Sequence, residues 1–347
     1  MTEVKTMTGK ERTMAFLHGE PCDHVPFHPL VMQYAAALTG VKYGEYCTDY
    51  RRQSHAMVNF AREHGLDWLH PAGFAYCEAT AYGMDVVYPE DGLPYARTPL
   101  IQNFEKDIDK IRPLDIEADP GMMNRVECVR HNKETVGDEF FLAAHCEGPL
   151  AEYTDLRGVS EALMDLIDDP DAVSDALRVI LDNAKHWILL QVQAGADCVS
   201  IGDAIVSQIS ESMYMELIYP LHRELVQYIS SLGVYSKFHI CGDITRLVPH
   251  LIDIGVNIID VDHMVKLKPE FFEKMGKDQF FSGNIDPVGE LRFGTPESIE
   301  KAVAELFAPP ERKNKIILAS GCEVPLGTPV ENYRAFCRTA ARYGKNN

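Results

Sequence analysis

Short apolar segments alternate with longer amphipathic stretches along the chain. Stretches such as 159–194 and 207–232 repeat apolar residues at three- and four-residue spacing, which is typical of helices that bury one face. The short runs are rich in Val, Ile and Phe, as buried strands are. Eight strands are expected, at residues 25–31, 66–71, 139–145, 197–203, 236–241, 257–262, 279–284 and 315–320. This alternation predicts an α/β fold with a parallel sheet, and eight strands are the number that closes a (β/α)8 TIM barrel.

The connection between the second and third expected strands departs from a minimal barrel. It exceeds the usual length of a loop, and residues 84–98 have the pattern of an additional hairpin. We therefore expect a single domain over residues 1–347, an elaborated barrel with N-terminal insertions. The alternative is an open doubly wound sheet, but no G-x-G-x-x-G turn follows an expected strand, which disfavours a dinucleotide-binding fold.

Composition and charge narrow the classes of partner. The chain is 46% hydrophobic and carries 33 Lys and Arg against 52 Asp and Glu, a net charge of −19. This excess of carboxylates disfavours nucleic acids and anionic membrane surfaces, because both are bound by clustered cations. The apolar runs are too short to span a bilayer, and the first twenty residues lack the apolar core of a signal peptide, so we expect a cytoplasmic protein.

Polar residues follow the carboxyl ends of the expected strands, where a barrel places its active site. His239 and Cys241 are two residues apart, so on a strand both side chains point to one face. Cys322 follows the last strand, from where its thiolate reaches across the mouth. Imidazole and two thiolates favour Zn²⁺, and three protein ligands with an open fourth position are typical of a catalytic site, so one Zn²⁺ per chain is expected. The alternative is that these are packing residues, as we expect for the widely spaced Cys22, Cys47, Cys77, Cys128, Cys198 and Cys337.

Three carboxylates near the same mouth are candidates for catalysis. Glu147, after the third expected strand, is expected either as a fourth, exchangeable metal ligand or as a group that handles a proton, and the alternative is a solvated carboxylate. Asp203 and Asp262 are expected to hydrogen-bond to His239 or to bind substrate, with helix capping as the alternative.

A series of short motifs follows in a fixed order in the carboxyl half. They are FHICG at 238–242, Gly255, DVD at 260–262, GNIDP at 283–287, GTPE at 294–297, ASGCEVP at 319–325 and TPVEN at 328–332. Over about residues 140–340 the chain resembles the uroporphyrinogen decarboxylase superfamily. The stretches GLD at 65–67 and EATAYG at 78–83 extend the resemblance, more weakly, towards the N-terminus.

Two branches of that superfamily differ in chemistry. The decarboxylases carry a P-x-W-x-M-R-Q-A-G-R segment whose arginines meet a polycarboxylate substrate, but the equivalent stretch here, 25–34, has no arginine. The other branch consists of zinc-dependent, corrinoid-linked methyltransferases with the signature H-x-C…C, which His239, Cys241 and Cys322 match. The resemblance therefore implies methyl transfer between a small molecule at the zinc and the cobalt of a separate corrinoid protein. That protein must carry the cobamide, because this chain has no D-x-H-x-x-G segment. A metal-free decarboxylase-like lyase and a non-catalytic, zinc-stabilised accessory subunit are the alternatives.

The identity of the small molecule is less constrained by the sequence. Aromatic residues near the ends of the first two expected strands favour an aryl methyl ether as methyl donor, and hence O-demethylation, although core packing is the alternative. These substrate-binding candidates are Phe27, His28, Tyr34, Phe74 and Tyr76, to which we add Asn284 after the seventh strand. A thiol acceptor such as coenzyme M needs a cation for its sulfonate, and the nearby candidates are Arg246, Lys266 and His263. The corrinoid protein is expected to bind transiently around the strand ends.

Overall fold

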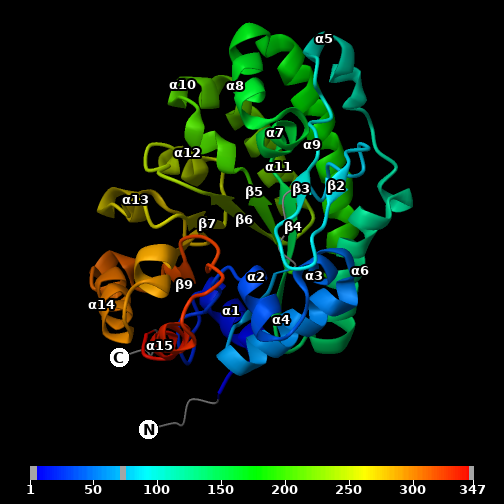
Figure 1. Cartoon of the computed structure of the whole chain (residues 1–347). Coiled ribbons are helices and arrows are strands. Elements are labelled where there is room, and N and C mark those ends of the chain that lie inside the picture. The colour runs from blue at the N-terminus through cyan, green and yellow to red at the C-terminus, as the bar shows by residue number, and fades with distance from the viewer. Residues whose placement is uncertain (1–5, 71–75, 344–347) are drawn as a thin grey trace.

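A curled, seven-stranded parallel sheet forms the centre of the fold in the computed structural model, which describes residues 6–70 and 76–343. Helices lie around this sheet, so the fold is α/β (Figure 1). The order of the strands is β1 (Trp68–Leu69), β4 (Phe141–Glu147), β5 (Cys198–Gly202), β6 (Tyr235–Ile240), β7 (Ile258–Val261), β8 (Phe280–Ile285) and β9 (Ile316–Ser320). These are seven of the eight expected strands, each confirmed to within two residues at either end. The expected hairpin at 84–98 is also confirmed, by the antiparallel pair β2 (Val86–Val87) and β3 (Tyr95–Ala96).

The helices connect the strands and cover the outside of the sheet. They are α1 (Gly9–Leu17), α2 (Gln33–Leu38), α3 (Tyr43–Thr48), α4 (Tyr50–His64), α5 (Phe104–Asp107), α6 (Pro120–Val136), α7 (Pro149–Arg157), α8 (Val159–Asp168), α9 (Pro170–Gln193), α10 (Glu211–Met213), α11 (Tyr219–Ser231), α12 (Val248–Asp253), α13 (Pro269–Lys274), α14 (Pro296–Phe307) and α15 (Val330–Ala340). The helical stretch 159–194 is divided because Asp169 caps a new helix and Pro170 occupies its first position. None of the helices in the described residues combines the length and the apolar composition needed to cross a membrane.

The prediction of a regular strand at 25–31 is wrong, because this segment forms a single bridge instead. Only Phe27 pairs with the sheet, through a parallel bridge to Leu318 of β9. Pro26 and Pro29 interrupt this segment, and because proline lacks an N–H a regular ladder does not extend from the bridge. The backbone O of Phe27 nevertheless accepts a hydrogen bond of 3.0 Å from the N–H of Asp67, next to β1. The segment is therefore bonded to both edges of the seven-stranded sheet.

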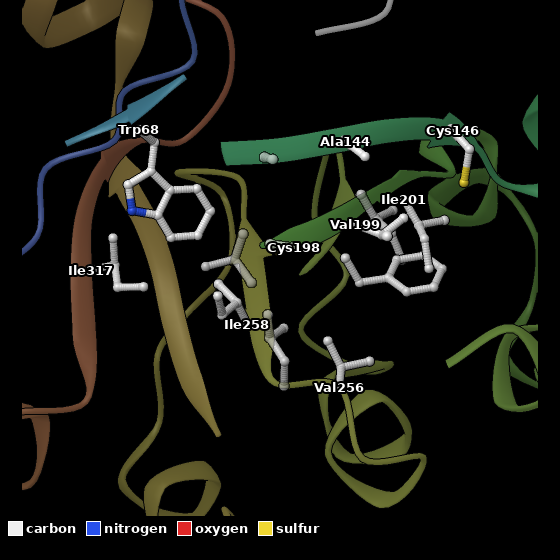
Figure 2. Packing of buried hydrophobic residues seen from close by; sticks show 14 of the residues in the cluster. Trp68, Ala144, Cys146, Cys198, Val199, Ile201, Val256, Ile258 and Ile317 are labelled. Atoms are coloured by element: carbon white, nitrogen blue, oxygen red, sulfur yellow. The ribbon is translucent and has the colours of Figure 1, made fainter. Parts of the chain in front are cut away.

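Hydrocarbon side chains from neighbouring strands fill the space around the sheet. Figure 2 shows Trp68, Ile258 and Ile317 in this core together with two cysteines, Cys146 and Cys198. Both thiols are fully buried, and burial raises the pKa of each above its usual range. Such thiols remain protonated and contribute to packing rather than to chemistry.

Phe27 offers a test of this packing. Its side chain is 1% exposed, and its ring packs edge-to-face against Phe336 of α15 at 5.0 Å between centroids. We expect Phe27→Ala to lower the free energy of unfolding by about 3–5 kcal/mol, because it removes a large buried ring and leaves a cavity. Phe293→Ala, at a ring that is 72% exposed, is the control and should change this energy by less than about 0.5 kcal/mol. Denaturant titration of both variants measures this, and similar unfolding energies for the two would contradict the buried role of Phe27.

Candidate metal centre

The three predicted metal ligands converge at the carboxyl ends of the strands. His239 lies near the end of β6, Cys241 directly follows that strand, and Cys322 follows β9. His239 Nε2 is 3.1 Å from Cys241 Sγ, which is 3.5 Å from Cys322 Sγ. In the described part of the chain, this is the one group of three or more His, Cys, Asp or Glu residues whose ligand atoms all lie within 4.8 Å of one another.

The electrostatics of this group favour a thiolate at Cys322. Hydrogen bonds from Cys241 and His239 outweigh burial and lower the pKa of Cys322 to about 4. The same hydrogen bond, together with burial, raises the pKa of Cys241 above its usual range. Burial alone would lower the pKa of His239, but Asp260 and Cys322 raise it to about 9. Metal binding would therefore release a proton from His239 and one from Cys241.

The donor set fits zinc. One imidazole and two sulfur atoms are borderline-soft ligands, which suit Zn²⁺ better than the hard cations Mg²⁺ or Ca²⁺. Three protein ligands leave one of four tetrahedral positions for an exchangeable ligand. The arrangement is therefore suited to holding a small molecule against the metal.

The carboxylate next to His239 is Asp260 of β7, rather than Asp203 or Asp262. Asp260 Oδ2 lies 3.1 Å from His239 Nδ1, a position that fixes Nε2 as the ligand atom. This contact follows from strand register, because His239 and Asp260 are direct Cα partners across β6 and β7. Sequence analysis named Asp260 only within the DVD motif and gave it no role, since its position opposite His239 depends on the register of two strands.

Asp203 and Asp262 have other hydrogen-bond partners. Asp203 lies 2.9 Å from His222 Nε2 and accepts hydrogen bonds from N–H groups in the first turn of α7. Asp262 accepts a 2.9 Å bond from the N–H of Gly242 and lies 2.7 Å from His263 Nδ1. Asp203 thus bonds the start of a helix, as in the capping alternative, whereas Asp262 connects the loops that follow β6 and β7.

Glu147 is the last residue of β4 and lies level with His239 across the sheet. Glu147, Gly202 and His239 are successive Cα partners across β4, β5 and β6. A Cβ atom on Gly202 would lie 3.4 Å from Glu147 Oε2, an ordinary van der Waals distance, so this carboxylate lies over β5. Burial and the charge of Asp203 raise the pKa of Glu147 to about 8. Glu147 is not among the clustered ligand atoms, and its pKa suits a group that exchanges a proton near neutral pH.

Further buried acids lie behind Glu147, and sequence analysis gave them no role. Glu78 Oε1 accepts a 2.7 Å hydrogen bond from the N–H of Glu147, and burial raises the pKa of Glu78 to about 7. Glu152 of α7 is 2% exposed, and neither carboxylate oxygen has a hydrogen-bond partner among the described residues. All three glutamates line a cavity of about 10 Å³, which has room for one water molecule. The EATAYG motif, which contains Glu78, was the available signal.

The aromatic candidates for substrate contact that the structure describes have separate packing partners. Phe27 packs under α15, His28 stacks on Trp68 at 4.5 Å, and Tyr34 packs against Phe60 and Tyr333, all three with at most 3% exposure. Tyr76 is half-buried, and its backbone N–H donates to Asp155. Phe74 lies outside the described residues. These contacts place Phe27 and Tyr34 in the hydrophobic core, the alternative considered for them.

Asn284 supports a loop beside the metal centre. Its Nδ2 donates hydrogen bonds of 3.2 and 3.0 Å to the backbone oxygens of Asp262 and Val265. The side chain therefore holds the loop that follows β7.

Comparison with known proteins places the chain in a family. The family model described as uroporphyrinogen decarboxylase (URO-D) matches residues 8–343. The chain belongs to this family. The resemblance inferred from the motifs is thereby confirmed.

Relatives from both branches are similar to this URO-D family member. Methylcobamide:CoM methyltransferase MtaA of Methanosarcina barkeri is 24% identical over 344 residues, which cover 97% of this chain and 98% of the relative. Uroporphyrinogen decarboxylase of Crocosphaera subtropica is 26% identical over 271 residues, 73% of each chain. The solved structure of a methyltransferase from Methanosarcina mazei matches with a TM-score of 0.82 at 21% identity, covering 97% of this chain and 99% of the other. The chain is homologous to corrinoid-dependent methyltransferases and shares the fold of that structure.

The metal content of the purified protein tests the centre. We expect about one zinc per chain in protein purified without a histidine tag and without added metal, and loss of this zinc in His239→Ala, because the imidazole is one of three ligands. Plasma mass spectrometry measures this. Cys337→Ser is the matched control, since Cys337 lies on α15 outside the metal group, and it should retain zinc. A folded, zinc-free wild-type protein would show that the three side chains are packing residues.

Proposed function

We propose that the protein is a zinc-dependent methyltransferase that moves a methyl group between a small thiol and the cobalt of a separate corrinoid protein. The observation that carries this proposal is the convergence of His239, Cys241 and Cys322. The homology to methylcobamide:CoM methyltransferases supports it. We also interpret residues 25–28, bonded to both edges of the sheet, as the eighth position of a barrel whose mouth contains this group.

A thiol is favoured over an aryl methyl ether by the surroundings of the site. The ether was favoured by aromatic residues, but Phe27 and Tyr34 lie in the core and His28 stacks on Trp68. For the sulfonate of a thiol such as coenzyme M, Arg246 is already engaged with three backbone oxygens and His263 with Asp262. Lys266 is exposed beside the same loops and is the cation we assign to an anionic tail.

Transfer to a thiol requires a proton acceptor and a thiolate. When bound, Zn²⁺ lowers the pKa of a thiol that it ligates. Glu147, behind the metal group and over Gly202, is placed to accept that proton, and Glu78 bonds the N–H of Glu147. As the sulfur–carbon bond forms, the cobalt–carbon bond breaks and its electron pair stays on cobalt, which goes from cobalt(III) to cobalt(I). Asp260 keeps His239 oriented throughout.

Cys322→Ser separates the proposed enzyme from its alternatives. We expect it to abolish methyl transfer between methylcobalamin and a thiol, measured from the cobalamin absorption spectrum, while the midpoint of denaturant unfolding changes little. A metal-free lyase would keep its activity in this variant, and a non-catalytic, zinc-stabilised subunit would instead lose fold stability. Retained methyl transfer would overturn the assignment.

The role of Glu147 is visible in the pH dependence. Because the pKa of Glu147 is raised to about 8 and the base form accepts the thiol proton, the transfer rate should rise with pH and level off above about pH 8. Glu147→Gln should keep its zinc, lower the rate by about 10²–10⁴-fold and lose this inflection. Asp203→Asn keeps Glu147 but removes a charge that raises its pKa, so this comparison variant should keep the inflection and move it to lower pH. An unchanged profile in Glu147→Gln would assign the proton to another group.

A further inference from the structure

A buried lysine lies directly beneath the metal centre. Lys237 is two residues before His239 on β6, so both side chains point to the same face of the strand. It is 1% exposed, and its ammonium lies 2.5 Å from Asp260 Oδ2. Burying such a pair contributes little to stability, because the desolvation of both charges offsets their attraction. The presence of this buried pair is therefore better explained by a role at the neighbouring metal centre than by a contribution to stability.

The same oxygen of Asp260 joins the lysine to the metal ligand. Oδ2 contacts both Lys237 Nζ, at 2.5 Å, and His239 Nδ1, at 3.1 Å. An oxygen that contacts an ammonium and a ring nitrogen at these distances belongs to a carboxylate, which forms a buried ion pair with Lys237. Lys237 and His239 therefore share one negative charge across β6 and β7, which are neighbours in the sheet (Figure 1).

The other titratable rings in this interior are neutral. His28 and His70 lie 5.6 Å apart between ring centroids, and His70 and His145 lie 5.4 Å apart. Burial and the charge of Lys237 lower the pKa of His28 to about 3 and that of His70 well below its usual range. Burial lowers the pKa of His145 to about 4. None of these three rings therefore supplies a charge to Asp260, whose contacts are Lys237 and His239.

This arrangement sets the charge of the metal site. Zn²⁺ and two thiolates are together neutral, and so are Lys237 and Asp260. A thiolate as fourth ligand then adds a single net negative charge. Without Lys237 the uncompensated Asp260 would make the site negative before that ligand arrives, and in a buried environment this repulsion is weakly screened.

We propose that Lys237 is a positioning residue for the thiolate-binding step, which neutralises Asp260 so that the metal accepts an anionic fourth ligand. This inference rests on the proposed function. It assigns to Lys237 a selectivity for the charge of the incoming ligand, rather than a contact with it.

Ligand titrations of the cobalt(II)-substituted protein test this selectivity without turnover. The probes are 2-mercaptoethanol, which binds as a thiolate, and neutral imidazole, each followed by the visible cobalt spectrum. For Lys237→Met we expect a thiol Kd about tenfold or more above that of the wild type, with little change in the Kd of imidazole. Arg157→Met breaks a buried pair with Asp165 on α7 and α8 and is the matched control, expected to change neither.

Two further variants cover a failure of Lys237→Met to fold. Asp260→Asn leaves the positive charge of Lys237 without a partner. The double variant Lys237→Gln/Asp260→Asn has a neutral side chain at both positions. The cobalt-loaded Asp260→Asn protein should therefore bind the thiol more tightly than the cobalt-loaded double variant. Equal thiol affinities in these variants, or a parallel loss for thiol and imidazole in Lys237→Met, would overturn the charge role. Failure of the proposed function is distinguishable, because the wild-type protein itself would then bind cobalt without binding the thiol.

Discussion

The curvature of the parallel sheet is the constraint on which the metal centre depends. Neighbouring strands lie about 4.8 Å apart, so in a flat sheet β6 and β9, three positions apart, would be separated by about 14 Å. Cys241 and Cys322 nevertheless bring their sulfur atoms to within 3.5 Å. The sheet must therefore curl, and the strand ends must meet at one mouth, before His239 and the two thiols act as one ligand set. The backbone ladders of β6 to β9 are in this sense part of the site.

The buried carboxyl groups on the two sides of this centre differ in the direction of their pKa shifts. Glu147, Glu78 and Glu152 are buried on one side, and burial raises the pKa of each. On the other side Asp260 remains ionised, because Lys237 and His239 hold its pKa down. Burial thus raises the pKa of some carboxyl groups near this centre, while neighbouring charges lower the pKa of one. In the proposed mechanism the first kind transfers protons and the second sets the charge of the site.

The sequence predicted what depends on local spacing and missed what depends on register or on side-chain direction. Seven strands followed from short apolar runs, and the ligand triad followed from the two-residue spacing of His239 and Cys241 with Cys322 after the last strand. Asp260 was recognised only as part of the DVD motif and was given no role, because its contact with His239 exists only once β6 and β7 are paired. Phe27 was expected at the mouth but packs against α15, since the direction of a side chain in an irregular, proline-interrupted segment cannot be read from a two-residue period.

The bridge between Phe27 and Leu318 has a consequence for how the molecule is made. It pairs a residue near the beginning of the chain with one near its end, and the same segment bonds Asp67 beside β1. During synthesis the segment around Phe27 can pair with β9 only after β9 has left the ribosome. The contact between the first and last segments of the sheet therefore forms late. Contacts between such distant positions slow folding and expose unpaired strand edges in the meantime. The candidate metal ligand Cys322, which follows β9, reaches its partners only at that last stage.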